Sequence, residues 1–345
     1  MNINLQAMNI KKPIRITLFV VGSLLILLLI VLIIGLAPLN RTIDYKPLLN
    51  TMNARIDSVD ADLIPAERGF TIGYGKVNLT PAQPVATAGY GKRLGKLYKS
   101  VHDSIYVRSL VIDNGIQRVA IVSADLLIVP PTVTAVLEQE LPAIGFTLDN
   151  TYLGATHSHN SIGNWAQGIT SLMFGSYEDS IVRFIADKIK ASIVKATANM
   201  VSSIIKVDSV ALPKGVYNGV TDNGPVDPLI RTIQIERSDS TKLLFISYTA
   251  HSTCLFSRDF VLSGDYPGKL TQTLESRKEY SMVMYMAGAV GSHGPAAPEG
   301  GWSCVDWMTD EITKKLRERQ GMQREIKNTT MEMHRVPLVL SEPQP

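Results

Sequence analysis

Histidine is the residue whose placement points most directly to chemistry in this sequence. The chain has six histidines, and His157 and His159 stand in the segment ATHSHNS, directly after the strand-like TYLG. If the strand continues through them, alternate side chains project from one face, so both imidazoles could converge on one metal ion or one substrate group. An H-x-H pair alone is a weak signal, because short motifs of this kind also occur without a ligand.

Two further polar clusters also follow predicted strands. His251 comes at the end of FISYT, and Ser292 and His293 lie in the Gly-rich segment GAVGSHGP after VMYMA. Taken singly, His251 could be a hydrogen-bonded histidine without a ligand. Ser292 could be an ordinary turn residue, since GAVGSHGP lacks the G-x-S-x-G spacing of a nucleophile elbow. Binding sites in α/β sheets nevertheless form where strands end in loops. The residues alone therefore leave two interpretations open, a zinc hydrolase and a set of structural histidines.

The elements that must position these clusters are short strands interleaved with helices. Runs rich in β-branched residues predict strands over Ile105–Asp113, Arg118–Val129, Leu243–Ala250 and Val283–Ala287. Isoleucine recurs every four residues from Ile181 to Ile193, which predicts an amphipathic helix with Ser176 as its N-cap. A second helix is expected over Val305–Arg319. We therefore predict a mixed α/β (α+β) fold, a layered domain of mixed β-sheets covered by helices.

The N-terminus carries the longest apolar run of the chain. Residues 16–37 contain no charge, and as a helix they would span roughly 33 Å, against about 30 Å of membrane hydrocarbon. A cleaved signal peptide is the alternative, but its apolar region usually has about 7–15 residues, and no small-x-small cleavage site stands before Pro38. We predict one retained transmembrane helix with residues 1–15 in the cytoplasm, because Lys11, Lys12 and Arg15 favour that side. Residues 38–68 should form a juxtamembrane stalk, and residues 69–345 an extracytoplasmic domain, periplasmic in a bacterium.

Composition excludes several classes of protein. The chain has 34 basic and 31 acidic residues, and the three N-terminal basic residues account for the excess, so we expect no nucleic-acid partner. With 45% apolar and 19% charged residues, it is not a disordered chain. Two cysteines, Cys254 and Cys304, exclude a disulfide scaffold and a Cys-based zinc ribbon. A disulfide between them is permitted outside the cytoplasm, and two unpaired buried thiols are the equal alternative.

Six segments, in order along the chain, resemble motifs of the neutral ceramidase family. ATHSHNSIGNW is similar to the family's S-A-T-H-T-H-S-G-P-G-G, IGYGKVNLTP to G-x-G-R-x-D-I-T, and AGYGKR to M-x-G-Y. VHDSIYVRSLVIDNG resembles G-I-H-x-x-x-x-A-R-A-x-V, VSADLLIV resembles N-A-D-L, and AHSTCLFSRDFVLSGDYPG resembles V-H-x-T-S followed by L-S-G-D-N-x-G. The resemblance covers roughly residues 70–300. It implies an amidase that uses one Zn²⁺ ion to cleave ceramide, a membrane lipid, into fatty acid and sphingoid base.

The resemblance also implies roles for individual residues. His157 and His251 match zinc ligands, and His159 matches a histidine that lies beside the metal and assists substrate and water. Zinc there would polarise the amide carbonyl and activate water near neutral pH. The active-site serine of the family's G-D-V-S-P-N falls on Ser292 after a shift of one residue, so Ser292 is a predicted catalytic residue together with His159.

Other positions are supporting or depart from the family pattern. Asp265 and His293 are predicted to bind substrate or to support the ligands. The family's Asn-Arg pair, whose arginine contacts substrate, is replaced by Asn218-Gly219. The family's remaining zinc ligands, the Glu of P-G-E-F and a Tyr, would lie beyond the end of the sequence, so we expect a chain that lacks its C-terminal part.

Three interpretations follow from the resemblance and these departures. The first is a membrane-anchored, zinc-dependent amidase of the ceramidase type. The second is a zinc amidase acting on other N-acylated amines, because a site that changes its polar donor usually changes its ligand. The third is a catalytically inactive, membrane-tethered protein that binds lipid or another partner. The oligomeric state is open in all three.

Overall fold

The computed structural model describes residues 12–35, 46–59, 66 and 68–338. The chain divides into two compact units, residues 1–60 together with 336–345, and residues 61–335. The first unit contains α1 (Lys12–Gly35) and α2 (Lys46–Asp57). Helix α1 is the one described helix long and apolar enough to cross a membrane, over Ile16–Ile33. The last two residues of the predicted span, and residues 38–45, 60–65 and 67 of the predicted stalk, lie outside the described residues.

The second unit is built on a strongly twisted nine-stranded sheet. Eight strands follow the order β13-β11-β10-β8-β1-β4-β5-β6, and the short β15 pairs with β8. Most pairs are antiparallel, but β11 with β13 and β5 with β6 are parallel. The strands are β1 (Phe70–Asn78), β4 (Tyr106–Asp113), β5 (Arg118–Ala124), β6 (Thr151–Ala155), β8 (Val201–Ala211), β10 (Leu229–Arg237), β11 (Lys242–Tyr248), β13 (Met282–Ala287) and β15 (Arg324–Glu325).

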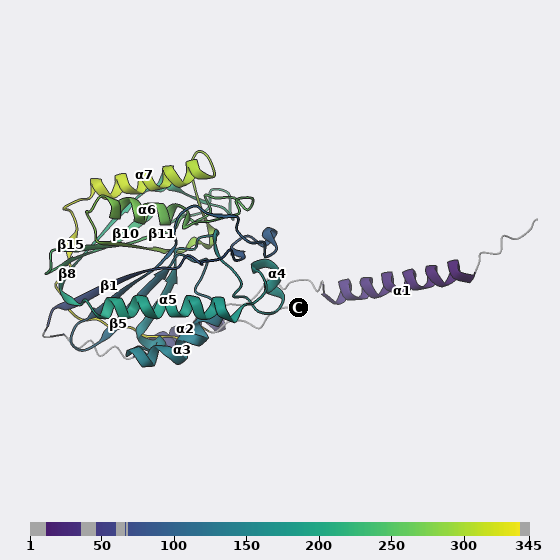
Figure 1. Ribbon diagram of the computed structural model, residues 1–345, viewed down its shortest axis with the longest axis horizontal. Coiled ribbons are helices and arrows are strands. Elements are labelled where there is room, and N and C mark those ends of the chain that lie inside the picture. The colour runs from purple at the N-terminus through teal and green to yellow at the C-terminus, as the bar shows by residue number, and fades with distance from the viewer. Residues whose placement is uncertain (1–11, 36–45, 60–65, 67, 339–345) are drawn as a thin grey trace, which may run out of the picture. The chain divides into compact units, whose positions relative to one another are not determined.

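Three two-stranded sheets and four longer helices complete this unit. The small sheets pair β2 (Thr87–Ala88) with β7 (Ser161–Ile162), β3 (Ser100–Val101) with β12 (Val261–Leu262), and β9 (Val216–Asn218) with β14 (His293–Pro295). The helices are α3 (Pro131–Glu140), α5 (Asp179–Thr197), α6 (Asp265–Ser276) and α7 (Trp302–Glu318). Figure 1 shows α6 and α7 over β10 and β11, and on the other side α5 below β1, with α3 lower still.

The two ends of the large sheet curl until they face each other. A side chain on Gly154 of β6 would meet Met286 of β13, and the Ser123 Oγ of β5 donates to the Tyr285 carbonyl of β13 at 2.5 Å. A buried apolar cluster that includes Ile72, Leu110 and residues from four other strands fills the space between the two halves. The fold therefore has helices outside two packed β-layers, which confirms the predicted mixed α/β fold with sheets covered by helices.

The strand and helix predictions hold in outline, and their errors lie at the ends. The strand predicted to reach Val129 ends at Ala124, because the chain turns there and Asp125 begins a buried polar network. Helix α5 is capped by Glu178 without a side-chain hydrogen bond, so Ser176 as N-cap was wrong. Helix α6, which starts at Asp265, is not among the helices predicted from the sequence.

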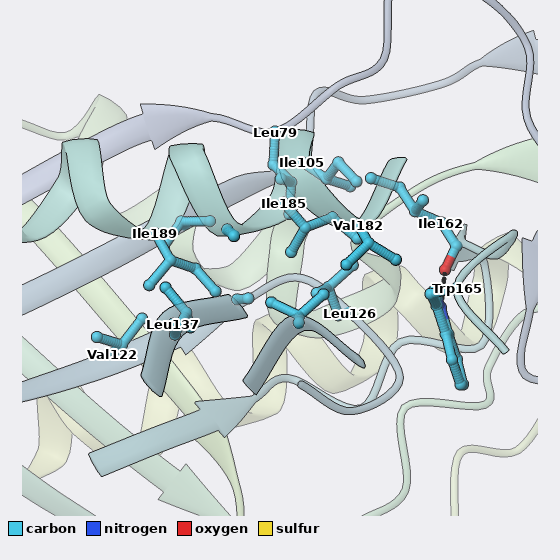
Figure 2. Packing of buried hydrophobic residues seen from close by; sticks show 14 of the residues in the cluster. Leu79, Ile105, Val122, Leu126, Leu137, Ile162, Trp165, Val182, Ile185 and Ile189 are labelled. Carbon is cyan, nitrogen blue, oxygen red and sulfur yellow. Dashed lines mark hydrogen bonds between the residues drawn. The ribbon is translucent and has the colours of Figure 1, made fainter. Parts of the chain in front are cut away.

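The larger core lies between α5, α3 and the β4–β5 layer. Ile185 and Ile189 of α5 are fully buried against Val122 and Leu137, as Figure 2 shows. Trp165 closes one end of this cluster, and its indole N–H donates to the Ile162 carbonyl at 2.7 Å. Burying each large aliphatic side chain contributes about 1.5–3 kcal/mol, so this interface holds α5 on the sheet.

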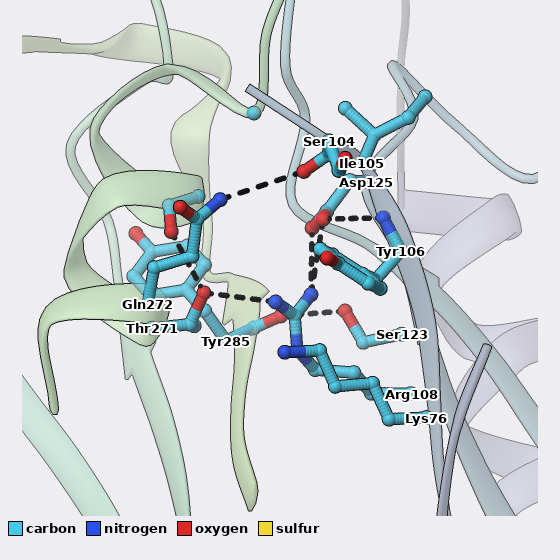
Figure 3. Close-up of polar contacts among 12 residues, drawn as sticks. Lys76, Ser104, Ile105, Tyr106, Arg108, Ser123, Asp125, Thr271, Gln272 and Tyr285 are labelled. Atoms are coloured by element: carbon cyan, nitrogen blue, oxygen red, sulfur yellow. Dashed lines mark hydrogen bonds and ion pairs between the residues drawn. The ribbon is translucent and has the colours of Figure 1, made fainter. Parts of the chain in front are cut away.

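A buried ion pair joins the two halves of the unit. Arg108 of β4 and Asp125 are each 1% exposed, with Nη1 at 3.0 Å from Oδ2. Figure 3 shows the other bonds, from Tyr106 N–H to Asp125 at 2.8 Å and from Arg108 Nη2 to Thr271 of α6 at 2.9 Å. Arg108 Nε is buried without a hydrogen-bond partner, but Nη1, Nη2 and the Asp125 carboxylate are all hydrogen-bonded, and the pair fixes the chain just after β5.

Candidate metal and catalytic site

The candidate site forms where four strands end. His157 and His159 follow β6, His251 follows β11, and Ser292 follows β13. Strands β5 and β6 run parallel, as do β11 and β13, and the curled sheet brings the two pairs together. Their carboxyl ends therefore open into one group of loops, which is the edge where α/β sheets build sites.

Three imidazoles meet at this edge. One nitrogen from each of His157, His159 and His251 lies within 4.8 Å of the other two. The ring centres are 5.0 Å apart for His157 and His159, 4.4 Å for His157 and His251, and 4.7 Å for His159 and His251. We call these three residues the histidine triad.

The triad does not form in the way that strand alternation predicted. Strand β6 ends at Ala155, and His157 has φ 60°, in the left-handed region that few non-glycine residues adopt. The turn at His157, rather than a shared strand face, aims both rings inward. A strained backbone at a site of convergent polar groups is a recurrent feature of functional sites.

Backbone carbonyls fix the orientation of two of the three rings. His157 Nδ1 donates to the Leu127 carbonyl at 2.7 Å, and His251 Nδ1 donates to the Val290 carbonyl at 3.1 Å. With the proton held on Nδ1, each ring presents its Nε2 lone pair to the centre of the triad. A second-nitrogen hydrogen bond of this kind is the usual support of a metal-binding histidine.

Burial keeps the triad neutral. It lowers the pKa of His157 and of His251, with His157 adding to the effect on His251. The pKa of His159 falls to about 3 through burial and the two neighbouring imidazoles, while the Gly89 backbone acts in the opposite direction. Neutral imidazole is the form that binds a metal, so the triad could hold a metal ion that prefers nitrogen ligands.

A buried arginine that the sequence reading missed anchors the segment of His159. Arg93 is 1% exposed, and it donates to the His159 carbonyl at 2.7 Å and to the Asn160 side chain at 3.1 Å. It also donates to the carbonyls of Ser257, Phe256 and Asp259. Arg93 thus ties the His159 segment to the loop after His251.

Asp265 lies at the start of α6 and holds the same loop from the other side. It is 1% exposed, and its carboxylate accepts from Leu255 N–H at 3.1 Å and from Tyr266 N–H at 2.7 Å. Burial raises the pKa of Asp265 to about 6. The structure therefore places Asp265 behind the loop that follows His251.

Cys254 and Cys304 form a disulfide, the first of the two alternatives left open by the sequence. Their Cα atoms are 5.3 Å apart and both side chains are buried. Cys254 lies three residues after His251, and Cys304 lies in the first turn of α7. The bond therefore fastens the loop after His251 to a helix.

Ser292 and His293 lie beside His251. The His251 N–H donates to the His293 carbonyl at 3.1 Å, and Ser292 Oγ is 3.1 Å from His293 Nδ1. His293 Nε2 accepts from Asp227 N–H at 3.0 Å, so in the neutral ring the proton is on Nδ1 and points to Ser292. A base that activates a serine must accept the proton of the hydroxyl group. His293 instead donates its Nδ1 proton toward Ser292, so it does not act as that base.

An open cavity of about 620 Å³ borders the triad at His157. Its wall is mainly apolar, with Leu127, Val129 and Leu153 among the lining residues, and His334 and Arg335 add polar groups. The arrangement joins an apolar surface to a cluster of nitrogen ligands.

The comparisons with known proteins agree on one family. The family model described as "Neutral/alkaline non-lysosomal ceramidase, N-terminal" matches residues 70–297. Two solved structures share the fold: "Ceramidase complexed with C2", at 18% identity and a TM-score of 0.69, and the neutral ceramidase from Pseudomonas aeruginosa, at 19% identity and a TM-score of 0.66. Each match covers 75% of this chain, and 45% and 46% of the two matched chains, so this chain spans less than half of their length.

Proposed function

The chain belongs to the neutral/alkaline non-lysosomal ceramidase family, and from this premise we propose that it is a zinc-dependent amidase that hydrolyses the N-acyl bond of ceramide-like lipids. The observation that carries the proposal is the histidine triad, with its donor atoms within 4.8 Å of one another. The products would be a fatty acid and a sphingoid base.

The donor set fits zinc. Tetrahedral zinc with Zn–N bonds of about 2.0–2.1 Å separates its nitrogen ligands by roughly 3.3 Å, within reach of the triad by small side-chain rotations. We assign His157 and His251 as ligands, because both carry the supporting Nδ1 hydrogen bond to a backbone carbonyl. A zinc ion held there supplies Lewis-acid polarisation of the amide carbonyl and activation of water.

The remaining residues handle protons and position the loops. His159 lies beside the two ligands, with its Nε2 2.8 Å from that of His251. In the tautomer with the proton on Nδ1, its Nε2 can take a proton from the attacking water and return it to the departing amine nitrogen. Asp265 holds the loop after His251, and His293 holds Ser292 beside the site. The hydrogen bond with His293 does not activate Ser292 as a nucleophile. We therefore assign the Ser292 hydroxyl to substrate binding.

The cavity beside His157 supports a lipid substrate. Its volume of about 620 Å³ and mainly apolar wall suit an acyl chain whose carbonyl lies at the triad. His334 and Arg335 then lie along the cavity as polar groups.

A second candidate function follows from Gly219. This residue stands where the resemblance would place a substrate-contacting arginine, and its N–H donates to the Ser292 carbonyl at 2.8 Å. Without that side chain, the polar end of the substrate has fewer donors. Other N-acylated amines, such as N-acyl amino acids, are therefore the alternative substrates.

Membrane anchoring is part of the proposal. Helix α1 is apolar over Ile16–Ile33. The two lysines and the arginine that precede this apolar span favour a cytoplasmic N-terminus. The second unit, residues 61–335, which we call the hydrolase unit, would then act outside the cytoplasm, close to the membrane that holds its substrate.

The test is an amidase assay of the full chain in detergent micelles. With zinc present, mass spectrometry should detect equal amounts of fatty acid and sphingoid base from a short-chain ceramide, and His159→Gln should lower turnover by about 10²–10⁴ fold. Cleavage of N-acyl amino acids but not of ceramide would favour the second candidate. No cleavage of either substrate by the zinc-loaded chain would contradict the enzymatic proposal and leave the lipid-binding interpretation.

A further inference from the structure

An exposed apolar surface lies near the site and has no role in the chemistry above. It consists of Leu94, Ile169, Leu172 and Met173, which are 69%, 82%, 66% and 42% exposed, and we call it the apolar patch. Ile169 lies in the short helix η4 (Gly168–Thr170), and Leu172 and Met173 lie in α4 (Ser171–Phe174), a spacing that puts the three on one side of a helix.

Two segments far apart in sequence pack together to make the patch. Leu94 follows η1 (Gly91–Arg93), which packs against α4. A side chain on Gly95 would meet the Gly175 backbone at 2.7 Å, and one on Gly91 would contact Met173 at 3.6 Å. The patch is therefore a continuous surface of two segments held in contact.

The exposure of Leu94 is fixed by the surrounding structure. Leu94 has φ 49°, a left-handed conformation that favours glycine or asparagine, yet a leucine stands there and points to solvent. The preceding residue, Arg93, is held by five hydrogen bonds. A strained position that displays a large apolar side chain indicates a surface with a binding role.

The charges around the patch indicate what it binds. Lys92 and Lys96 are exposed on the first segment, and residues 91–97 and 167–177 contain no acid. The next acids are Glu178 and Asp179 at the start of α5, where Asp179 pairs with Arg183. Two copies of the chain that met through this patch would place lysines against lysines. Apolar side chains flanked by lysines instead match an anionic membrane surface, where the apolar groups enter the lipid and the lysines meet the headgroups.

A hollow near the first segment of the patch also borders a residue that contacts the site. Gly89, Tyr90 and Lys92 line a hollow of about 530 Å³, with Phe256 and Arg258 on the other wall. The Tyr90 ring is 4.9 Å from the His159 ring. The hollow therefore lies beside Tyr90, the residue that packs against the ring of His159.

We propose that the apolar patch is the surface by which the hydrolase unit docks on the outer face of an anionic bilayer, with Ile169 and Leu172 inserted among the lipids. The inference rests on the membrane anchoring proposed above, and it does not depend on hydrolysis. Helix α1 ends at Gly35 and β1 begins at Phe70, so the intervening chain keeps the unit within at most about 120 Å of the bilayer.

The test uses the full chain with one added cysteine, since both native cysteines are in the disulfide. Leu172→Cys and, as a matched control, Ile116→Cys are each labelled with an environment-sensitive fluorophore and reconstituted in vesicles that contain a bromo-acyl phosphatidylcholine quencher. Ile116 is 54% exposed in the turn between β4 and β5, at the opposite end of β5 from Asp125. Vesicles of three parts phosphatidylcholine to one part phosphatidylglycerol are compared with phosphatidylcholine alone.

In anionic vesicles the label at position 172 should lose about half of its fluorescence, while the label at 116 changes little. Lys92→Gln and Lys96→Gln should each lower the ratio of docked to undocked protein about fivefold, and neutral vesicles should do the same. Equal quenching at 172 and 116 in a chain that floats with the vesicles would overturn the inference alone. A label at 172 that responds to protein concentration rather than to lipid would assign the patch to contacts between copies instead. A chain that does not float with the vesicles would overturn the proposed anchoring and, with it, this inference.

Discussion

The Nε2 atoms of His159 and His251 lie 2.8 Å apart, although 92 residues separate them in the sequence. Their approach depends on the packing of one parallel strand pair on the other and on Arg93, which binds both loops. Because His251 Nδ1 donates to the Val290 carbonyl, the proton between the two Nε2 atoms belongs to His159, and a metal ion bound to His251 Nε2 would take the place of this hydrogen bond. The triad is therefore set up either for a hydrogen bond or for a ligand, and the predictions below test the framework that holds it.

The first prediction concerns acid. The pKa of each triad histidine is lowered in the folded chain, so below the ordinary value of 6.5 the unfolded chain takes up protons that the folded chain does not. In the metal-free protein, the contribution of these histidines to the free energy of unfolding should therefore be constant above pH 7 and fall as the pH falls. His159, with a pKa of about 3, should contribute a loss of roughly 2 kcal/mol by pH 5. Chemical denaturation at pH 7.5, 6 and 5 measures this loss, and the stability of His159→Gln should depend less steeply on pH. An equal dependence on pH in the two proteins would contradict the lowered pKa of His159.

The second prediction concerns the buried ion pair. Asp125→Asn leaves the Arg108 charge buried without its counter-ion and should destabilise the folded chain by about 3–5 kcal/mol. The double variant Arg108→Met with Asp125→Leu should recover much of this loss, because no charge then remains in the interior. Arg183→Gln, in an ion pair with Asp179 on the surface of α5, is the matched control and should change little. Denaturation midpoints measure these changes in stability. An Asp125→Asn variant that loses little stability would show that the pair is not required to position β5.

The third prediction concerns the disulfide. Cys254 and Cys304 close a loop of 50 residues, so Cys254→Ala with Cys304→Ala should lower the free energy of unfolding by about 2–4 kcal/mol. Zinc affinity should fall as well, because the loop after His251 loses its attachment to α7. The unreduced protein should resist alkylation. Two thiols that alkylate in the denatured, unreduced protein would contradict the disulfide.

The sequence singles out the histidines of this site but not the geometry that brings them together. His157, His159 and His251 could be singled out because the chain has six histidines, these three follow predicted strands, and the segment ATHSHNS resembles a known family motif. The turn at His157 could not be predicted, since local propensity disfavours a histidine with φ 60° and only tertiary contacts impose it. The carbonyls of Leu127 and Val290 carry no sequence signal either, because any residue has a carbonyl group. Arg93 was missed for a related reason: a single arginine between glycines looks like a solvated loop residue until its five partners are in place.

For the fold as well, individual strands and helices were predicted better than their arrangement in space. Apolar periodicity located α5, and runs rich in β-branched residues located the strands β4, β5, β11 and β13. Neither pattern could show that β6 and β13 would face each other, since that depends on the twist accumulated over the whole sheet. Helix α6 was missed because its first turn, DYPG, contains a proline and a glycine that read as a loop.

Zinc content of single alanine variants is the most direct test of the central claim that His157 and His251 hold a metal used by His159. The full chain, His157→Ala, His251→Ala and His159→Ala are purified in detergent, loaded with zinc, dialysed and analysed by atomic emission beside a short-chain ceramide assay. We expect one zinc per wild-type chain, loss of zinc from the His157 and His251 variants, and a His159 variant that keeps most of its zinc while turnover falls by about 10²–10⁴ fold. Equal zinc content in the wild type and in the His157 and His251 variants would contradict the ligand assignment, and with it the proposed mechanism.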